Sequence, residues 1–296
     1  ENRTNIVMNA NRKKKRVLAG TMAALMVATS SPTGAFTYQD LSIVKAETVA
    51  TEGYYTEDGF YIEDGVLRWY RGEEENIVIP NDVVSIGSGA FLDDEIKSVT
   101  IPESVTRIEE YAFYKTSLEE ITIPDTVEYL GEYAFSRCEK LSKAELNTKT
   151  IEQNAFANCT KLTQVTFGDN VETIDREAFK NCEKLEILTL GKGIKNIGIC
   201  CFQSCISLKE VSFPTGIDTI GSFSFEGCTG IEKIVFEGAV KNIDSSAFKR
   251  LTSLTKIEFS DEMGRLGMFA FEGCTAVESI ISNTLHRGRQ NNIRKA

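Results

Sequence analysis

Residues 123–144, IPDTVEYLGEYAFSRCEKLSKA, contain one complete copy of the pattern that decides the fold. At its centre Phe135 follows a small residue, and this pair of a small residue and a phenylalanine returns along the chain at spacings of 21 to 23 residues. Repetition at a fixed period of roughly 20 to 50 residues is the sequence signature of a solenoid. The nine phased phenylalanines are Phe91, Phe113, Phe135, Phe156, Phe179, Phe202, Phe225, Phe248 and Phe271.

Each repeat combines two apolar patterns. Leu118, Ile121 and Ile123 form a Leu-x-x-Ile-x-Ile segment with polar residues between, which predicts a short strand. One such strand per repeat, always running the same way, predicts a parallel sheet along one face of the solenoid. A Pro or Gly then turns the chain. A Val-x-x-Ile-Gly segment crosses the opposite face, and Ala-Phe-x-x-Cys predicts a tight helical or 3₁₀ turn.

The full pattern, Ile-Pro-x-x-Val-x-x-Ile-Gly-x-x-Ala-Phe-x-x-Cys-x-x-Leu-x-x-Ile, resembles the BspA-like (Treponema-type) leucine-rich repeats of bacterial secreted and surface proteins. The resemblance covers residues 77–282. It implies a leucine-rich-repeat solenoid of the α/β horseshoe type, with about nine repeats and a parallel β-sheet on its concave face. Short strands and 3₁₀ or helical turns would lie on the convex side. The resemblance also implies export and adhesion. A regular Asn at the strand end is missing, so no asparagine ladder is expected.

Residues 47–76 precede the repeats and differ from them. Asp58-Gly59 and Asp64-Gly65 are hairpin-turn dipeptides between aromatic and aliphatic residues, which predicts a small N-terminal β cap over the first repeat. This segment holds the only Trp and several Tyr, so aromatic ligand binding is an alternative role. At the other end, residues 283–296 carry four basic and no acidic residues and leave the repeat pattern. We expect this tail to be disordered, on a chain that is truncated or ends in altered sequence.

The N-terminus has the pattern of a targeting segment. Five basic residues at 12–16 precede an apolar run over 17–28, which predicts a secretory signal peptide at 8–46, with residues 1–7 lying upstream of Met8. Cleavage after Ala46 is favoured and cleavage after Ala35 is the alternative; a basic amphipathic helix is the other interpretation. The run is shorter than the ~20 residues that span a bilayer. We therefore expect a secreted or cell-surface protein without a membrane span after signal removal.

The net charge argues against a nucleic-acid-binding protein, and the position of the cysteines within the repeat argues against disulfides. Lys and Arg number 33 against 43 Asp and Glu, a net charge of −10, which is the wrong sign for a nucleic-acid-binding protein. Export permits disulfides, but equivalent positions of stacked repeats lie ~4.8 Å apart, whereas disulfide Cβ atoms converge to ~3.5–4.5 Å. Leu251 shares the cysteine position, so we expect buried free thiols; a disulfide or a metal site is the less favoured interpretation. With the nine phenylalanines, the predicted core contains Cys138, Cys159, Cys182, Cys205, Cys228 and Cys274.

Catalytic patterns are missing. The only His is His286, in the tail, so the repeats offer neither a catalytic triad nor a histidine metal cluster. No cofactor, metal site or catalytic residue is predicted, and we expect a protein that is not an enzyme. Acidic residues occur in every repeat, so a hydrolase using paired carboxylates stays open as an alternative.

The predicted function is protein binding through the exposed side of the concave sheet. Partners would be extracellular or surface proteins, from the host matrix or from bacteria. The alternatives are a solvated face that binds nothing and a passive spacer for a missing C-terminal domain. An uncapped last repeat would also expose a sheet edge, which favours weak self-association. The candidate binding residues form one outward column: Thr100, Thr122, Glu145, Thr166, Thr189, Ser212 and Glu258.

Overall fold

The computed structural model describes residues 53–259 and 263–282. The predicted signal peptide and the predicted disordered tail lie outside the described residues. The described strands fall into a cap, β1 to β3, and two series that alternate along the chain from β4 to β22. The cap strands are β1 (Tyr54–Tyr55), β2 (Phe60–Glu63) and β3 (Val66–Tyr70).

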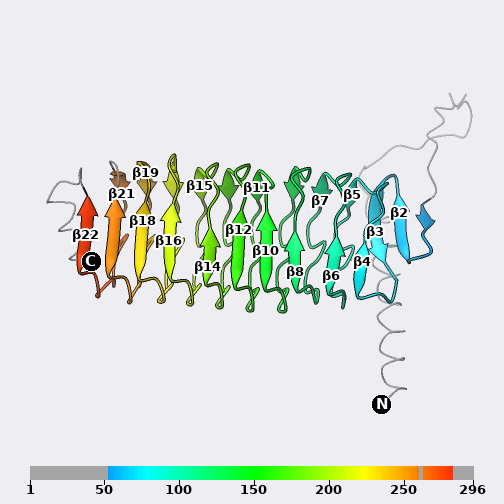
Figure 1. Ribbon diagram of the computed structural model, residues 1–296, viewed down its shortest axis with the longest axis horizontal. Helices are drawn as coiled ribbons and strands as arrows, with labels where there is room; N and C mark the ends of the chain where they lie inside the picture. Colours follow the sequence, from blue (N-terminus) through cyan, green and yellow to red (C-terminus); the bar gives the residue numbers. More distant parts are fainter. Residues whose placement is uncertain (1–52, 260–262, 283–296) are drawn as a thin grey trace, which may run out of the picture. The chain divides into compact units, whose positions relative to one another are not determined.

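The even-numbered strands arise from the Leu-x-x-Ile-x-Ile segments. Alternate side chains of these strands are buried, as in β12, because the apolar positions recur with a period of two. Figure 1 shows them side by side in one row. They are β4 (Asn76–Val78), β6 (Ser98–Thr100), β8 (Glu120–Thr122), β10 (Lys143–Leu146), β12 (Gln164–Phe167), β14 (Ile187–Thr189), β16 (Glu210–Phe213), β18 (Lys233–Phe236), β20 (Lys256–Phe259) and β22 (Ser279–Ser282).

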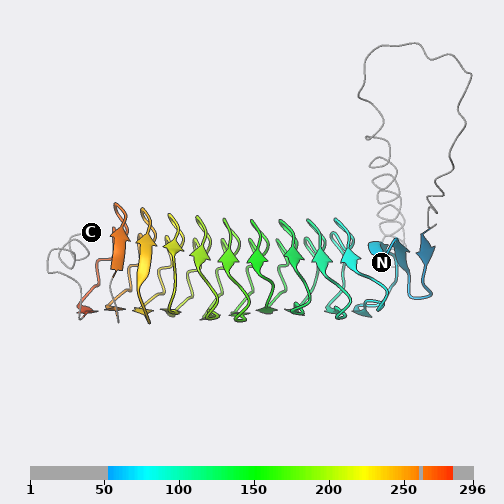
Figure 2. The same ribbon diagram turned by 90° about the horizontal axis from the view of Figure 1, so that it is seen from above.

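The odd-numbered strands arise from the Val-x-x-Ile segments. Together with the cap they form one twelve-stranded sheet, antiparallel from β1 to β3 and parallel from β3 to β21. Figure 2 shows them as a second row of strands. They are β5 (Ser85–Ile86), β7 (Arg107–Ile108), β9 (Tyr129–Leu130), β11 (Thr150–Ile151), β13 (Thr173–Ile174), β15 (Asn196–Ile197), β17 (Thr219–Ile220), β19 (Val240–Ile243) and β21 (Met263–Leu266).

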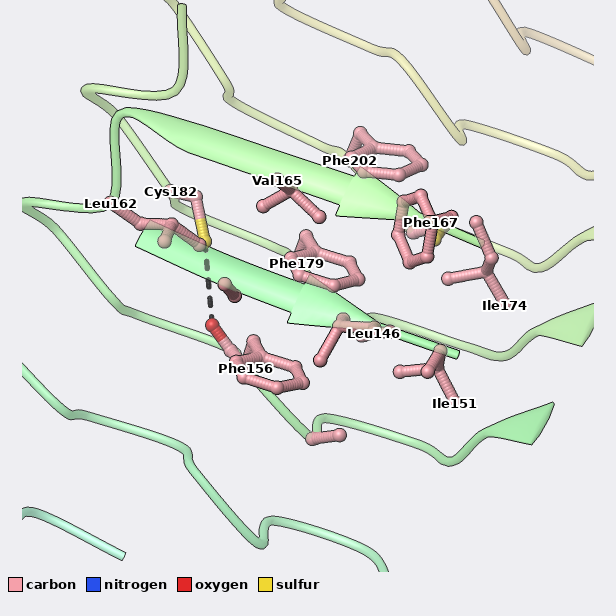
Figure 3. Packing of buried hydrophobic residues seen from close by; sticks show 14 of the residues in the cluster. Leu146, Ile151, Phe156, Leu162, Val165, Phe167, Ile174, Phe179, Cys182 and Phe202 are labelled. Carbon is pink, nitrogen blue, oxygen red and sulfur yellow. Dashed lines mark hydrogen bonds between the residues drawn. The ribbon is translucent and has the colours of Figure 1, made fainter. Parts of the chain in front are cut away.

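The core is a continuous stack of phenylalanine rings, one from each repeat. The nine rings are 0–1% exposed, and successive ring centroids from Phe91 to Phe271 lie 4.9 to 5.5 Å apart. Figure 3 shows three of these rings, Phe156, Phe179 and Phe202, between the side chains of the two strand series. Full burial of one such side chain contributes about 1.5–3 kcal/mol, and each ring requires its neighbours to achieve it.

The turn around each phenylalanine differs from the expected helical or 3₁₀ turn, because the described residues contain no helix. Tyr133 and Arg137, which flank Phe135 two residues away on either side, have left-handed backbones with φ of 57° and 60°. Left-handed residues recur along the turn, and every second amide points toward the next repeat. The amide of Tyr133 donates to the Gln153 carbonyl at 3.2 Å, and that of Phe135 to the Ala155 carbonyl at 2.8 Å. The amides between them donate within the turn, as Ser136 does to the Tyr133 carbonyl at 3.1 Å, so bonds within the turn alternate with bonds between repeats.

The cap covers the first repeat with one face of its antiparallel sheet. Phe60, Ile62, Leu67 and Tyr70 are 0–1% exposed on this inner face, and the Tyr70 ring lies 5.8 Å from that of Phe91. The strand register shifts between Tyr61 and Ile62, so β3 holds one extra residue there. Such a bulge re-aims side chains, and it lets both Leu67 and Tyr70 point inward. The Asp-Gly dipeptides occupy the predicted turns, with Gly59 at φ 89° and Gly65 at φ 72°.

No helix among the described residues has the length and apolar character that crossing a membrane requires.

Candidate functional site

The predicted column of outward residues lies on the even strands, in what we call the even-strand face. Strand register aligns Thr122, Glu145, Thr166 and Thr189 directly opposite one another across β8, β10, β12 and β14. This row of four is continuous because those strands form one parallel sheet. Of its members Thr122 and Thr189 are exposed, whereas Glu145 and Thr166 are half-buried.

Two further segments extend the column. In the sheet from β16 to β22, Ser212 aligns with Val235, Glu258 and Ile281, and in the first sheet Thr100 aligns with Val78. Thr100 is exposed, and Ser212 and Glu258 are half-buried. The candidate list omitted the exposed ends of the column, Val78 at 67% and Ile281 at 49% exposure. The alternation of inward and outward residues in β4 and β22 predicts that Val78 and Ile281 point outward. They were left out because they are apolar, whereas the other members of the column are mostly polar.

Lysines flank the acidic members of the column. Lys143 Nζ lies 2.7 Å from Glu145 Oε1, and Glu258 Oε1 lies 2.5 Å from Lys256 Nζ and 3.8 Å from Lys233 Nζ. The hydrogen bond from Lys256 lowers the pKa of Glu258, and the neighbouring lysine charges act in the same direction. Ser212 Oγ donates to Glu237 Oε1 at 2.8 Å. The even-strand face is therefore a surface of hydroxyl groups and locally neutralised charges.

The even-strand face is interrupted by a seam between β14 and β16. The even strands form sheets of two, four and four strands, and β14 and β16 are the facing edges of the last two. Leu188 and Leu190 are only partly buried beside the seam, and Ile187 is 54% exposed. The odd strands β15 and β17 remain paired behind it. The sheets on either side of this seam are thus joined by the core and the odd strands, without backbone pairing between β14 and β16, and a second boundary between sheets lies between β6 and β8.

The repeated cysteines form a ladder of hydrogen bonds between repeats. Each of the six phased thiols donates to the carbonyl of the phenylalanine in the preceding repeat, with Sγ···O distances of 3.0 to 3.3 Å. Figure 3 shows the bond from Cys182 to Phe156. All eight cysteines are free, and burial raises the pKa of Cys182 to about 12. The Cys182 thiol is therefore a protonated donor.

Sequence reasoning treated the cysteine as an apolar filler and missed this role. A partial signal was Thr116, which occupies the same position three residues after Phe113 and also carries a donor, although it bonds within its own repeat. Its Oγ1 donates to the Phe113 carbonyl at 3.0 Å. Leu251 concealed the signal, because a leucine at the same position suggests a purely apolar pocket.

Metal chemistry finds no support in the described part of the chain. Among residues 53–259 and 263–282, no group of three or more His, Cys, Asp or Glu side chains is arranged to hold a metal ion. The predicted binding residues thus lie on an extended surface, and the predicted core residues lie beneath it.

Comparison with known proteins gives a family and several similar folds. A family model described as the BspA type leucine rich repeat region matches residues 68–186 and 172–291, with six copies. No curated protein matches the chain. A solved leucine-rich repeat protein from Bacteroides ovatus ATCC 8483 is 22% identical over 76% of this chain and 79% of its own, with a TM-score of 0.49.

Two further solved structures are similar. A leucine-rich repeat protein of T. pallidum is 22% identical over 83% of this chain and 94% of its own, with a TM-score of 0.47. A leucine-rich cell surface protein from Faecalibacterium prausnitzii A2-165 is 29% identical over 74% of this chain and 62% of its own, with a TM-score of 0.40. Because the family model spans well over half of its residues, and its repeats stack as a leucine-rich-repeat solenoid, this chain belongs to the BspA-type leucine-rich repeat family.

Proposed function

We propose that the chain is a secreted or cell-surface binding module, adhesin-like and not an enzyme, which recognises host-matrix or bacterial surface proteins through its even-strand face. The observation that carries this proposal is the in-register row of Thr122, Glu145, Thr166 and Thr189 across one sheet. The basic and apolar segments at the N-terminus support export, and membership of the family supports a repeat module.

The geometry of the row favours a macromolecular partner over a small molecule. Parallel strands lie about 4.8 Å apart, so four strands present roughly 14 Å of continuous surface. Side chains along the row are short, which lets the surface of a partner approach the strands closely. Stacked repeats characteristically use such extended surfaces for protein recognition. The apolar ends, Val78 and Ile281, add exposed apolar area of the kind found at interfaces.

Catalysis would need several functional groups that point toward one reacting atom, whereas the even-strand face presents its side chains in a row. The acidic members Glu145 and Glu258 are each engaged by a lysine, and Lys233 lies between Glu258 and the carboxylate of Glu210. The hydrolase and the passive spacer remain the alternatives that the experiment must separate from a binding module.

The test is capture of purified matrix and bacterial surface proteins by the chain and by a face variant. The variant combines Thr122→Arg, Glu145→Lys, Thr166→Arg and Thr189→Arg, all on residues that point outward. The matched control changes the odd strands and a nearby loop instead: Thr150→Arg, Glu128→Lys, Thr173→Arg and Thr219→Arg. We expect capture to be lost in the face variant and kept in the control, at unchanged melting temperature.

Capture that survives in the face variant would place the site elsewhere, and no specific capture at all would favour the spacer. Hydrolysis of a glycan or peptide by the purified chain, abolished by a single Asp or Glu substitution, would establish the hydrolase instead.

A further inference from the structure

The outer face of the cap carries a second row of aromatic side chains that the core does not use. The strand register pairs Tyr55 with Tyr61 and Tyr61 with Trp69, so one side chain from each cap strand lies in line. The centroids of Tyr55 and Tyr61 are 4.9 Å apart, and the rings of Tyr61 and Trp69 stack at 4.3 Å with an interplanar angle of 3°. The Trp69 indole N–H donates to Tyr55 Oη at 3.0 Å. The row is thus held in one geometry.

These rings are accessible, unlike those of the inner face. Tyr55 is 50% exposed and Trp69 is half-buried, whereas Phe60 and Tyr70 on the inner face are 1% exposed. Tyr61 stands between the two outer rings, and the backbone at Gly53 approaches its phenol so closely that a Cβ there would collide with it. Tyr55 therefore provides the larger exposed ring surface, and Trp69, stacked on Tyr61 on one side, provides a smaller one.

Arg71 completes the row. Its guanidinium carbon lies 5.5 Å from the centroid of the Tyr55 ring and 5.7 Å from that of Trp69. None of the ion pairs between described residues involves Arg71, whereas Arg68 on the same strand pairs with Glu63 at 3.1 Å. A guanidinium held against aromatic rings keeps its N–H edge in a fixed fork, which matches the two oxygens of a carboxylate.

We propose that Tyr55, Trp69 and Arg71 form a binding site for a carboxylated sugar, such as a uronate or a sialic acid residue. The apolar face of a pyranose ring would lie against the rings of Tyr55 and Trp69, and its carboxylate would accept two hydrogen bonds from Arg71. This site is separate from the even-strand face, so the proposal stands or falls independently of the proposed function.

Local composition favours a sugar over a peptide. The site offers two neighbouring aromatic side chains and one guanidinium whose carbon lies within 5.7 Å of both ring centroids, which match the one apolar ring face and the one carboxylate that a single uronate or sialic acid residue carries. One free guanidinium amid exposed acidic residues such as Glu57 and Asp58 suits a ligand with a single carboxylate better than a polyanion.

The chain contains a built-in reporter for the test. Trp69 is its single tryptophan, so tryptophan fluorescence reports on this site alone. The chain is titrated in about 0.15 M salt, where charges beyond roughly 8 Å are screened, with 3′-sialyllactose and with a hyaluronan tetrasaccharide. Lactose and chitotetraose are the neutral counterparts. We expect saturable fluorescence changes with at least one acidic sugar, and responses at least tenfold weaker with its neutral counterpart.

Variants assign the response to the named side chains. Arg71→Lys keeps the charge but lacks the fork, and Tyr55→Ala removes one ring; each should weaken binding at least tenfold at unchanged melting temperature. Arg107→Lys is the matched control, because Arg107 also lies over a tyrosine, 4.4 Å from the Tyr129 centroid, but is paired with Glu109 at 3.0 Å. Its binding should equal that of the original chain.

Several results would overturn the proposal. Equal responses to acidic and neutral sugars, or to sodium acetate at the same concentration, would remove the role of a carboxylated ring. Unchanged binding by Arg71→Lys and Tyr55→Ala would place the ligand elsewhere. A response to a hexa-aspartate peptide without any response to the sugars would make the outer cap face a protein contact.

Discussion

A small residue precedes every stacked phenylalanine because its carbonyl meets the preceding repeat. The Phe202 amide, for example, donates to the Ser224 carbonyl at 2.7 Å, as other phenylalanine amides donate to alanine carbonyls at the equivalent position. Cys201 and Ser224 replace the alanine in two repeats, and the Ser224 hydroxyl is buried without a hydrogen-bond partner among the described residues. We predict that Ser224→Ala stabilises the protein by about 1 kcal/mol, because an unsatisfied buried hydroxyl costs about 1–3 kcal/mol. Urea unfolding measures the change.

Ser136 is the matched control for this prediction. It is also buried, at 2% exposure, but its Oγ donates to the Ala157 carbonyl at 3.0 Å. Ser136→Ala should therefore destabilise the protein by about 1 kcal/mol. Equal effects of the same sign for the two substitutions would contradict the role assigned to the hydrogen bond.

Because of the buried thiols of Cys182 and Cys274, the stability of the protein should fall as the pH rises into the alkaline range. Burial raises the pKa of Cys182 to about 12 and that of Cys274 to about 11, whereas an unfolded thiol has a pKa of about 8.5. Above pH ~9 the unfolded state loses a proton that the folded state retains, so stability falls as the pH rises toward the folded pKa. The slope for each thiol is at most about 1.4 kcal/mol per pH unit.

We therefore predict a melting temperature that is flat from pH 7 to about 8.5 and falls above pH ~9. Lysine and tyrosine titration contributes in the same range, so the informative comparison is with Cys182→Ala. That variant should lose stability less steeply with pH. Parallel curves for the two proteins would show that the Cys182 thiol does not contribute.

At the scale of the strand and the turn, sequence reasoning succeeded where the pattern is local. The Leu-x-x-Ile-x-Ile segments predicted the parallel even strands, since a period of two determines which side chains face the core. The Ala-Phe-x-x-Cys segment was interpreted as a helical or 3₁₀ turn; no helix occurs there, because its amides alternate between hydrogen bonds within the turn and hydrogen bonds to the next repeat. A spacing of three residues suits a helix and also suits this turn, and only the left-handed backbone at residues such as Tyr133 distinguishes them.

The seam leaves the facing edges of β14 and β16 without a paired strand. On its other side, β16 pairs with β18 along the full length of both strands, from Glu210 opposite Lys233 to Phe213 opposite Phe236. No backbone pairing joins β14 to β16 among the described residues. We predict that the amides of residues 209–213 exchange with solvent faster than those of residues 232–236, because open backbone groups lack protection. Hydrogen-exchange mass spectrometry of these two segments tests the difference, and equal protection would mean that the seam closes in solution.

At the scale of the whole molecule, the sequence predicted only those features of the candidate site that follow from the repeat period. The period aligns Thr122 with Thr166 and Thr189, so their common face followed from the sequence. The seam did not follow, because it depends on how repeats at β14 and β16 pack and not on which residues alternate. The outer row of the cap was also hidden, since the extra residue beside Ile62 in the strand register decides which aromatic side chains face outward.

The last described repeat exposes an unusual amount of apolar side chain. Met268 is 72% and Phe269 61% exposed, whereas Phe223, at the equivalent position in mid-stack, is 37% exposed. Exposed apolar patches favour association, so we predict weak self-association that increases with protein concentration. Sedimentation velocity should show it for the original chain and for Phe223→Lys, but not for Met268→Lys combined with Phe269→Lys. Association of all three proteins alike would assign the contact to another surface.

Because each repeat packs only on its neighbours, the position of a core substitution should matter as much as its chemistry. Phe179→Ala removes a fully buried ring that stacks on Phe156 at 5.1 Å and on Phe202 at 5.3 Å, which should cost about 3–5 kcal/mol. Phe271→Ala removes a ring with one stacked partner, Phe248, and should cost less. Cys182→Ala, which loses one hydrogen bond of the ladder, should also cost much less.

Since all eight thiols are free, reductant should leave every melting temperature unchanged. Calorimetry of the three variants with and without reductant decides the matter: a drop of many degrees under reductant would mean that disulfides support the stack, and equal losses for Phe179→Ala and Phe271→Ala would mean that neighbour packing does not determine its stability.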